Sequence, residues 1–592
     1  MVMLFISGLM FRLKNPGIPC YLPRLMIWLF FLLSPPLQIV IQAQQKSMDE
    51  YQEAMHYINT RGEVYLRIPI TEKQLVIELA DFLSVDHVAG DHIYLYANRT
   101  GLQELVKHHI AFYAETPPSL SRIVDMAVEE FPEPGWDSYP TFEQYVECMH
   151  AFADSFPAIC RLDTIGFSIH NHEILVVKIS DHAELEEPEP EFFYTSTMHG
   201  DEVTGYVLMI RLIDWLLNHY GKDEKVTTLV DNMQIWINPL ANPDGTYYSG
   251  NDSIYGATRF NANSVDLNRN YPAPNGNIHP DNNDYQPENL VMMTFMKSRY
   301  LVMSANLHGG AEVVNYPWDT WPELHPDDDW FRFISRQYAD TAHLYNDQYM
   351  TQLDNGITNG YAWYSIWGGR QDYVTYFLGG REVTIELSVD KIPPADTLPY
   401  LWEYNYRSLL NFMEQCLYGI SGQVTNGQTG TPVKSMIEVE GHENRNTFIL
   451  SDSITGNYYR LIKEGIYNLQ VSAEGYNDTV ISGVRVFDFQ PTVLNIQLSP
   501  YIPPAYPADS IIISPNPFID HLNINIWSGK QDKAFISMFD AGGSKVITEK
   551  TISLIEGENF IVLDCPDIDP GVYILKITRS SAMKKAKIIK LE

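Results

Sequence analysis

The stretch EFFYTSTMHGDEVTGYVLMIRLIDWLLNHY, residues 191–220, decides the fold of the central part of this chain. It opens on a run of aromatic and β-branched residues, which predicts a buried strand. After Glu202 the apolar residues recur with helical spacing, and Gly221 ends the predicted helix. His199 and Glu202 therefore lie on a strand-to-helix turn, at the sheet edge where open α/β sheets bind their ligands.

A lone histidine, His308, belongs with this pair. It follows the apolar run YLVMSANL, residues 300–307, and precedes two glycines, so we expect it just past a second strand. Two imidazoles and a carboxylate form an open zinc site, whereas structural zinc usually takes four protein ligands. His199, Glu202 and His308 thus predict a hydrolytic zinc site. The pair alone is weak evidence, because roughly two His-x-x-acid pairs are expected by chance in this chain.

Further polar residues give the pair its context. Arg259, Asn268 and Arg269 cluster on the loop RFNANSVDLNRNYP, and a guanidinium binds a carboxylate through two parallel hydrogen bonds. Glu386 comes late in an apolar strand, where a carboxylate is costly unless it is paired or serves as a base. Taken singly, each residue fits a solvated loop or a structural ion pair. Together with the zinc ligands they indicate a catalytic site.

These motifs resemble the zinc metallocarboxypeptidases, and within them the regulatory branch that includes carboxypeptidases N, E, M and D. The resemblance extends over residues 137–415. It implies a carboxypeptidase fold of the α/β class, with a mixed twisted sheet flanked by helices. It also implies one Zn²⁺ per catalytic domain, bound by His199, Glu202 and His308.

The same resemblance implies roles for the remaining residues. Glu386 would accept the proton of the attacking water and pass it to the leaving amine, and Arg259 would stabilise the oxyanion. Asn268 and Arg269 would bind the terminal carboxylate, and Tyr364 would close over the substrate. Binding a free carboxylate fixes the cut one residue from the C-terminus, so the expected substrates are the C-termini of peptides or proteins.

Specificity depends on Asp319 in NYPWD. In the regulatory branch an Asp eleven residues past the third zinc ligand binds a C-terminal Lys or Arg, which implies a preference for basic residues. Gln371 and Asp372 in GGRQD support this branch, but Arg370 stands where the family usually has an apolar residue. An Arg that faced the pocket would repel basic side chains, and one turned outward would not. A turn-forming Asp is the alternative for Asp319.

The chain has 592 residues and a net charge of -34, which predicts several domains and argues against nucleic acid as a partner. The sequence leaves the oligomeric state open. Residues 46–130 predict a small α/β N-terminal module with the strands EVYLRIPI, HIYLYAN and IAFYAE and two helices between them. This module resembles the prodomain of some digestive relatives. Inhibition and a passive role in folding are both open alternatives.

Two β-sandwich domains are expected after the catalytic region. Residues 418–500 alternate short strands with glycine turns and resemble the transthyretin-like domain of the regulatory branch. Residues 508–592 contain SPNPF and GVYILKI and resemble the C-terminal sorting domain of type IX secretion cargo. That resemblance implies the secretion machinery as a partner and a secreted or outer-surface location in a Gram-negative bacterium. An adhesion module is the alternative.

The beginning of the chain supports export. Residues 1–43 combine basic residues with an apolar run that ends at Ala43, which predicts a signal peptide rather than a retained membrane anchor. Export permits disulfides, and a bridge between Cys148 and Cys160 is geometrically possible. None of the cysteines has the spacing of a zinc finger.

Three functions follow from the sequence. The first is an exported zinc carboxypeptidase that removes basic C-terminal residues. The second is an amidase or deglutamylase for γ-linked or cell-wall peptides, since relatives with this fold perform both reactions. The third is a catalytically silent binding protein. Asn268, Arg269 and Asp319 favour ordinary α-carboxyl peptides, and the presence of Glu386 argues against the silent protein.

Overall fold

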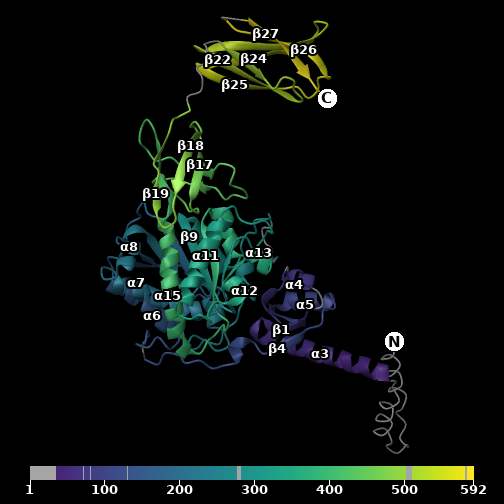
Figure 1. Cartoon of the computed structure of the whole chain (residues 1–592). Helices are drawn as coiled ribbons and strands as arrows, with labels where there is room; N and C mark the ends of the chain where they lie inside the picture. Colours follow the sequence, from purple (N-terminus) through teal and green to yellow (C-terminus); the bar gives the residue numbers. More distant parts are fainter. Residues whose placement is uncertain are drawn as a thin grey trace, which may run out of the picture. The chain divides into compact units, whose positions relative to one another are not determined.

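The computed structural model describes residues 35–70, 73–80, 82–129, 131–276, 282–501, 510–580 and 583–591 (Figure 1). Most of the predicted signal peptide lies outside these residues, and its last part begins helix α3 (Pro35–Arg61). Within the described ranges, no helix is long and apolar enough to cross a membrane. Residues up to Pro500 form one unit and those from Tyr501 a second.

The N-terminal module is an antiparallel sheet in the order β2-β3-β1-β4, covered by helices. Apolar side chains of the sheet and of the helices form its own core. The sequence predicted all of these elements except α3 and β2, the strand whose residues SVDHVA alternate poorly. The elements are α3, β1 (Val64–Pro69), α4 (Lys73–Ala80), β2 (Ser84–Ala89), β3 (His92–Ala97), α5 (Arg99–Lys107) and β4 (Tyr113–Glu115).

The central domain is built on a mixed sheet in the order β11-β10-β12-β9-β7-β8-β6-β5. The strands are β5 (Cys160–Phe167), β6 (Glu173–Ile179), β7 (Glu191–Ser196), β8 (Gln234–Asn238), β9 (Leu301–His308), β10 (Ala311–Tyr316), β11 (Ile357–Asn359) and β12 (Arg381–Ser388). The longer helices are α6 (Phe142–Ser155), α7 (Thr204–His219), α8 (Glu224–Asn232), α10 (Pro287–Lys297), α11 (Asp328–His343) and α15 (Leu398–Glu414). Short helices are α9 (Pro243–Thr246), α12 (Gln352–Asn355), α13 (Gly360–Trp363) and α14 (Arg370–Tyr373).

Helices cover both faces of this sheet, which explains why its central strands β7, β8, β9 and β12 are buried along their whole length. Successive side chains of a strand point to opposite faces. Phe192 and Tyr194 of β7 pack in one cluster with α6, α7, α8, α11 and α15, whereas Phe193 packs in another with α10. Cys148 and Cys160 are buried in the first cluster as free thiols, so the bridge considered from the sequence is absent.

The register of the parallel strands brings the predicted site together. β7 pairs with β9 in parallel so that Ser196 lies opposite Leu307, and the residues beyond the two carboxyl ends emerge next to each other. β12 also runs parallel to β9, and Glu386 lies directly opposite His308, the last residue of β9. The turn after β7 and the ends of β9 and β12 thus form one edge of the sheet.

A strand-rich domain follows the central domain within the first unit. Its two sheets have the orders β16-β13-β19, with β20 also on β13, and β15-β14-β17-β18. Apolar side chains from both sheets share one core, as in a β-sandwich. The strands are β13 (Gly419–Asn426), β14 (Met436–Val439), β15 (Ile449–Leu450), β16 (Asn457–Arg460), β17 (Gly465–Ser472), β18 (Thr479–Val486), β19 (Pro491–Val493) and β20 (Ile496–Leu498).

The second unit is also a two-sheet domain, with the orders β21-β22-β25 and β24-β23-β26-β27 around its own core. Residues 502–509, which precede it, lie outside the described residues. The strands are β21 (Ile511–Ser514), β22 (His521–Ser528), β23 (Asp532–Asp540), β24 (Lys545–Leu554), β25 (Gly557–Asp564), β26 (Gly571–Thr578) and β27 (Met583–Lys590).

A buried ionic network joins the central domain to the sandwich. Asp327, ahead of α11, accepts hydrogen bonds from Arg381 of β12 and from Arg460 of β16, at 2.9 Å and 2.8 Å. The Nε2 atom of His442 lies 2.7 Å from the same carboxylate. Although burial opposes it, the two arginines hold the pKa of Asp327 well below its usual value. Arg460 also pairs with Glu443, 2.8 Å away, whereas Asp327 is the carboxylate that pairs with Arg381 among the described residues.

We expect Asp327→Ala to lower the free energy of unfolding of the first unit by about 3–5 kcal/mol, because it leaves the buried guanidinium of Arg381 without a counter-charge and Arg460 with Glu443 alone. Urea unfolding followed by tryptophan fluorescence measures the change. Glu323→Ala is the matched control, since its ion pair with Arg445 is exposed and should contribute less than about 1 kcal/mol. Equal effects of the two substitutions would contradict the prediction.

Candidate active site

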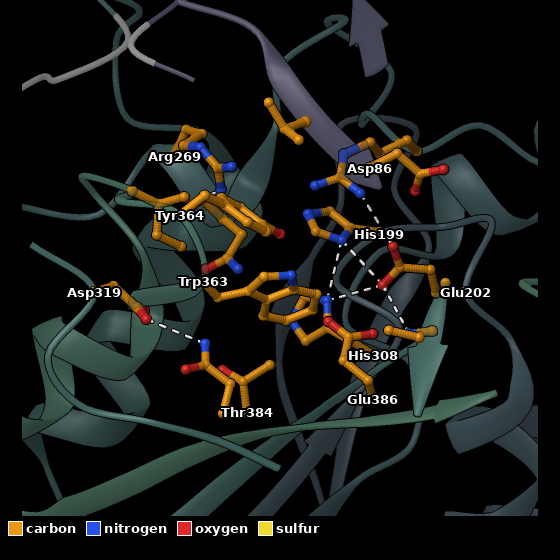
Figure 2. Close-up of a pocket in the computed structure, with 18 residues that line it drawn as sticks. Asp86, His199, Glu202, Arg269, His308, Asp319, Trp363, Tyr364, Thr384 and Glu386 are labelled. Atoms are coloured by element: carbon orange, nitrogen blue, oxygen red, sulfur yellow. Dashed lines mark hydrogen bonds and ion pairs between the residues drawn. The ribbon is translucent and has the colours of Figure 1, made fainter. Parts of the chain in front are cut away.

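His199, Glu202 and His308 converge at the sheet edge as the sequence predicted (Figure 2). The Oε2 atom of Glu202 lies 3.0 Å from Nδ1 of His199 and 2.8 Å from Nδ1 of His308, and the two Nδ1 atoms are 3.1 Å apart. All three side chains are buried. The two histidines and the glutamate therefore direct one ligand atom each to a common point.

This donor set fits zinc. Ligand atoms about 2.1 Å from a tetrahedral zinc ion lie about 3.4 Å from one another, which is close to the separations seen here. A second group fixes the imidazole of His199, because Nε2 of this ring lies 3.0 Å from Oδ1 of Asp266. Carboxylates that orient ligating histidines in this way are usual at zinc sites.

The turn that carries the first two ligands is sterically constrained. Thr197 adopts a left-handed conformation with φ of 61°, which is costly for a β-branched residue, and its hydroxyl donates to the carbonyl of Glu202. Gly200 packs so closely on the next loop that a Cβ atom would lie 2.4 Å from the backbone of Gly245. Tertiary contacts thus hold His199 and Glu202 in position.

The other oxygen of Glu202 faces two cations. Oε1 accepts hydrogen bonds from Arg259 at 3.1 Å and from Lys391 at 2.7 Å. Burial alone would raise the pKa of Glu202, but its contacts with His199 and, next, Lys391 hold it well below its usual value. Burial lowers the pKa of His308 to about 4. A neutral imidazole and an ionised carboxylate are the forms that bind a metal ion.

Glu386 lies beside this cluster without a fixed partner. Its Oε2 atom is buried and accepts no hydrogen bond from the described residues. Burial, and next the negative charge of Glu202, raise the pKa of Glu386 well above its usual value. An unpaired buried carboxylate next to three candidate metal ligands is typical of a general base.

The carboxylate-binding residues expected from the sequence line the same pocket. The side-chain oxygen of Asn268 accepts the backbone N–H of Arg370, so its amide nitrogen remains for a ligand. Arg269 has a buried Nε atom that finds no acceptor among the described residues. Arg259 donates through Nε to Asp266 and through Nη1 to Glu202, and no described residue accepts from its Nη2 atom.

Asp319 and Tyr364 also line the pocket, whereas Arg370 does not. In Figure 2, Asp319 lies apart from the His199 and Glu202 cluster, across the pocket. The guanidinium of Arg370 is fully buried and points away, toward the hydroxyl of Thr195 and the carboxylate of Glu382, which lies 3.1 Å from Nη2. Its charge is therefore neutralised inside the protein, although the side chain is not turned to solvent.

The N-terminal module forms part of the pocket wall. Val85 and Asp86 of β2 line the pocket, and Asp86 lies 2.9 Å from Lys391. Ser84 donates to Asp266 at 2.5 Å, so the module also contacts the carboxylate that orients His199. Tyr364 packs against the core of the module. In Figure 1, α4 and α5 of the module lie near α13, the helix that precedes Tyr364.

Sequence reasoning missed three of these residues. Asp266 is two residues before Asn268 in the same motif, and its position in that loop was the available signal. Lys391 follows β12 in a loop with no recognisable pattern, and Asp86 lies on the strand that was not predicted. The last two could be found only from contacts between distant segments.

Comparisons with known proteins match two parts of this chain to families. A family model described as zinc carboxypeptidase matches residues 145–408, and one described as a secretion system C-terminal sorting domain matches residues 513–591. The crystal structure of carboxypeptidase A from Helicoverpa armigera has 17% identity and a TM-score of 0.47, covering 60% of this chain and 97% of that one.

Two curated relatives share more sequence identity with this chain than that crystal structure does. Human carboxypeptidase D is 38% identical over 347 residues, which cover 56% of this chain but only 24% of that protein, so the chain spans about a quarter of its length. Mouse carboxypeptidase M is 35% identical over 387 residues, covering 62% of this chain and 86% of that protein. Because the second match includes most of the relative, the chain belongs to the zinc carboxypeptidase family.

Proposed function

We propose that this protein is a zinc-dependent carboxypeptidase that removes the last residue of peptides or proteins. One observation carries the proposal: a His, Glu, His donor set and an unpaired buried glutamate share a pocket with groups that suit a free carboxylate. Zinc bound by His199, Glu202 and His308 would polarise the scissile carbonyl and lower the pKa of a water molecule.

The protein's own residues would complete the reaction. Glu386, whose unpaired Oε2 atom has no competing donor in the described structure, would accept a proton from the attacking water and return it to the leaving amine. Arg259 is held on two sides by Asp266 and Glu202, so its Nη2 atom would donate to the developing oxyanion without reorganising.

Substrate binding would rest on the amide nitrogen of Asn268 and the guanidinium of Arg269. Both lie in the pocket, and a carboxylate bound between them fixes the scissile bond near the metal ligands. Tyr364 would close over the bound residue. This arrangement favours α-carboxyl peptides over the γ-linked substrates of an amidase or deglutamylase. A silent binding protein would have no use for the costly, unpaired Glu386.

We also propose a preference for basic C-terminal residues. Asp319 lies in the pocket, and the one feature that argued against the preference, Arg370, is paired with Glu382 and directed away. A basic side chain would therefore meet a carboxylate and no opposing cation from Arg370. The net charge of -34 would add a general attraction for cationic peptides.

The match of residues 513–591 to a sorting domain supports export as part of the function. We propose that the protein is secreted or displayed on the outer surface of a Gram-negative bacterium, with the type IX secretion machinery as its partner. The second unit would serve this transport step, and the first unit would act on peptides outside the cell.

The N-terminal module would keep the chain latent. Val85 and Asp86 line the pocket, and Asp86 shares Lys391 with Glu202, so the module would restrict the access of a peptide to the site. The segment that follows the module carries an exposed arginine, Arg122, where a protease could cut. A module that only assists folding would not need to form part of the pocket wall.

Glu386→Gln should lower kcat about 10²–10⁴-fold, because the amide cannot accept the proton, while one zinc ion per chain remains bound. His308→Ala should lose the zinc together with the activity. Release of the C-terminal residue from a peptide and elemental analysis for zinc provide the two measurements. If Glu386→Gln kept full activity, or if this variant no longer bound zinc, the assignment of Glu386 as the general base would be wrong.

Asp266→Asn should weaken zinc binding about 10–100-fold, since it removes the charge that orients His199. Competition with a chelator measures the affinity. Asp244→Asn is the control, because Asp244 forms a similar contact of 2.7 Å with His172 outside the pocket and should leave zinc affinity unchanged. The prediction fails if the two substitutions have the same effect on zinc binding.

Asp86→Ala should raise kcat/KM of the full chain at least about tenfold, because it removes the ion pair that anchors β2 over Lys391. Arg67→Ala is the control on the same module, since its pair with Glu115 is partly exposed and remote from the pocket. An unchanged rate for Asp86→Ala would favour a passive folding role for the module.

A further inference from the structure

Only one oxygen of the Asp319 carboxylate is available to a ligand. Oδ1 accepts two hydrogen bonds, from the side-chain amides of Asn315 and Gln371, each at 3.1 Å. Gly360 closes another side, because a Cβ atom there would lie 1.7 Å from Oδ1. Among the described residues, no group donates to Oδ2. The two amides thus saturate Oδ1 and leave Oδ2 alone for a substrate.

The pocket wall around Asp319 is short of positive charge. A second carboxylate, Asp372, is buried beside it and accepts the backbone N–H groups of Asp319 and Thr320, at 3.1 Å and 2.8 Å. Burial, and next the charge of Asp372, raise the pKa of Asp319 well above its usual value. Arg269 is the cation that acts on Asp319 most strongly, and the proposed function commits this residue to the substrate carboxylate. The positive charge that pairs with Asp319 must therefore come from the side chain of the substrate.

The same wall contains buried acceptors without donors. The side-chain oxygens Oδ1 of Asn315 and Oε1 of Gln371 have no hydrogen-bond partner in the part of the chain that is described. Asn315 is 7% exposed and Gln371 is 1% exposed, and Asn315 lines the pocket. An unsatisfied buried acceptor costs about 1–3 kcal/mol. The polar groups around Asp319 thus include acceptors without a donor, which adds to the shortage of positive charge at this wall.

We infer that this pocket selects C-terminal lysine over C-terminal arginine, an inference that rests on the proposed carboxypeptidase function. An ammonium concentrates its charge and donors on a single atom, which suits the one free oxygen of Asp319. A guanidinium gains most from a carboxylate when both oxygens accept from its planar fork. The saturated Oδ1 removes that gain from arginine and leaves lysine unaffected.

The test compares three peptides that differ only in their last residue, which is Lys, Arg or Leu. The zinc-loaded full chain is assayed, and the Asp86→Ala chain as well if the first is silent. We expect kcat/KM for Lys to exceed that for Arg about tenfold, the value of one charge-assisted hydrogen bond, and both to exceed that for Leu. An Arg rate equal to or above the Lys rate overturns the inference and leaves the proposed function standing. No release from any peptide overturns the proposed function itself.

A substitution tests the cause of the selectivity. Gln371→Met keeps the volume of the side chain but removes the amide that saturates Oδ1, so KM for the Arg peptide should fall relative to KM for the Lys peptide by at least several-fold. Gln415→Met is the matched control, because this buried glutamine bonds to Gln337 away from the pocket. An unchanged ratio in Gln371→Met contradicts the mechanism. Zinc-loaded Glu386→Gln provides a second measurement without turnover, and calorimetry should show tighter binding of the Lys peptide.

Discussion

The buried carboxylate of Glu202 is the group on which the rest of the site depends. One of its oxygens meets the imidazoles of His199 and His308, and the other meets Arg259 and Lys391. In an interior of low dielectric, its negative charge attracts the cations Arg259 and Lys391 strongly and so holds them beside the two imidazoles. The fold must therefore place these four groups around one carboxylate.

The parallel strands β7, β9 and β12 bring His199, His308 and Lys391 together, because each residue lies at or beyond the carboxyl end of one strand. Their carboxyl ends share one edge of the sheet, and helices cover both faces, so polar side chains gather where the strands end. The register of the two strands places Glu386 of β12 directly opposite His308 of β9, so both residues lie within the sheet. A base carried on a packed strand is held more rigidly than one on a loop, which suits a group that must remain unpaired and oriented.

The N-terminal module takes part in the charge balance of the site as well as in its shape. Asp86 adds a second carboxylate to Lys391, and Ser84 donates to Asp266, the residue that orients His199. Separating the module would return these partners to water and change the field around the metal ligands. The position of the module at the pocket and the charge balance of the site thus depend on the same contacts, those of Asp86 with Lys391 and of Ser84 with Asp266.

The sequence by itself predicted the candidate metal ligands, the candidate base and the candidate carboxylate-binding pair, because each stands at a strand end or in a short motif. Tertiary structure decided the contacts that cross the chain: Asp266 is 67 residues from His199, and Lys391 is 189 residues from Glu202. It also decided the direction of Arg370, since a buried guanidinium turns toward whichever carboxylate the packed core provides. Local spacing encodes which groups are present, and only packing determines which of them meet.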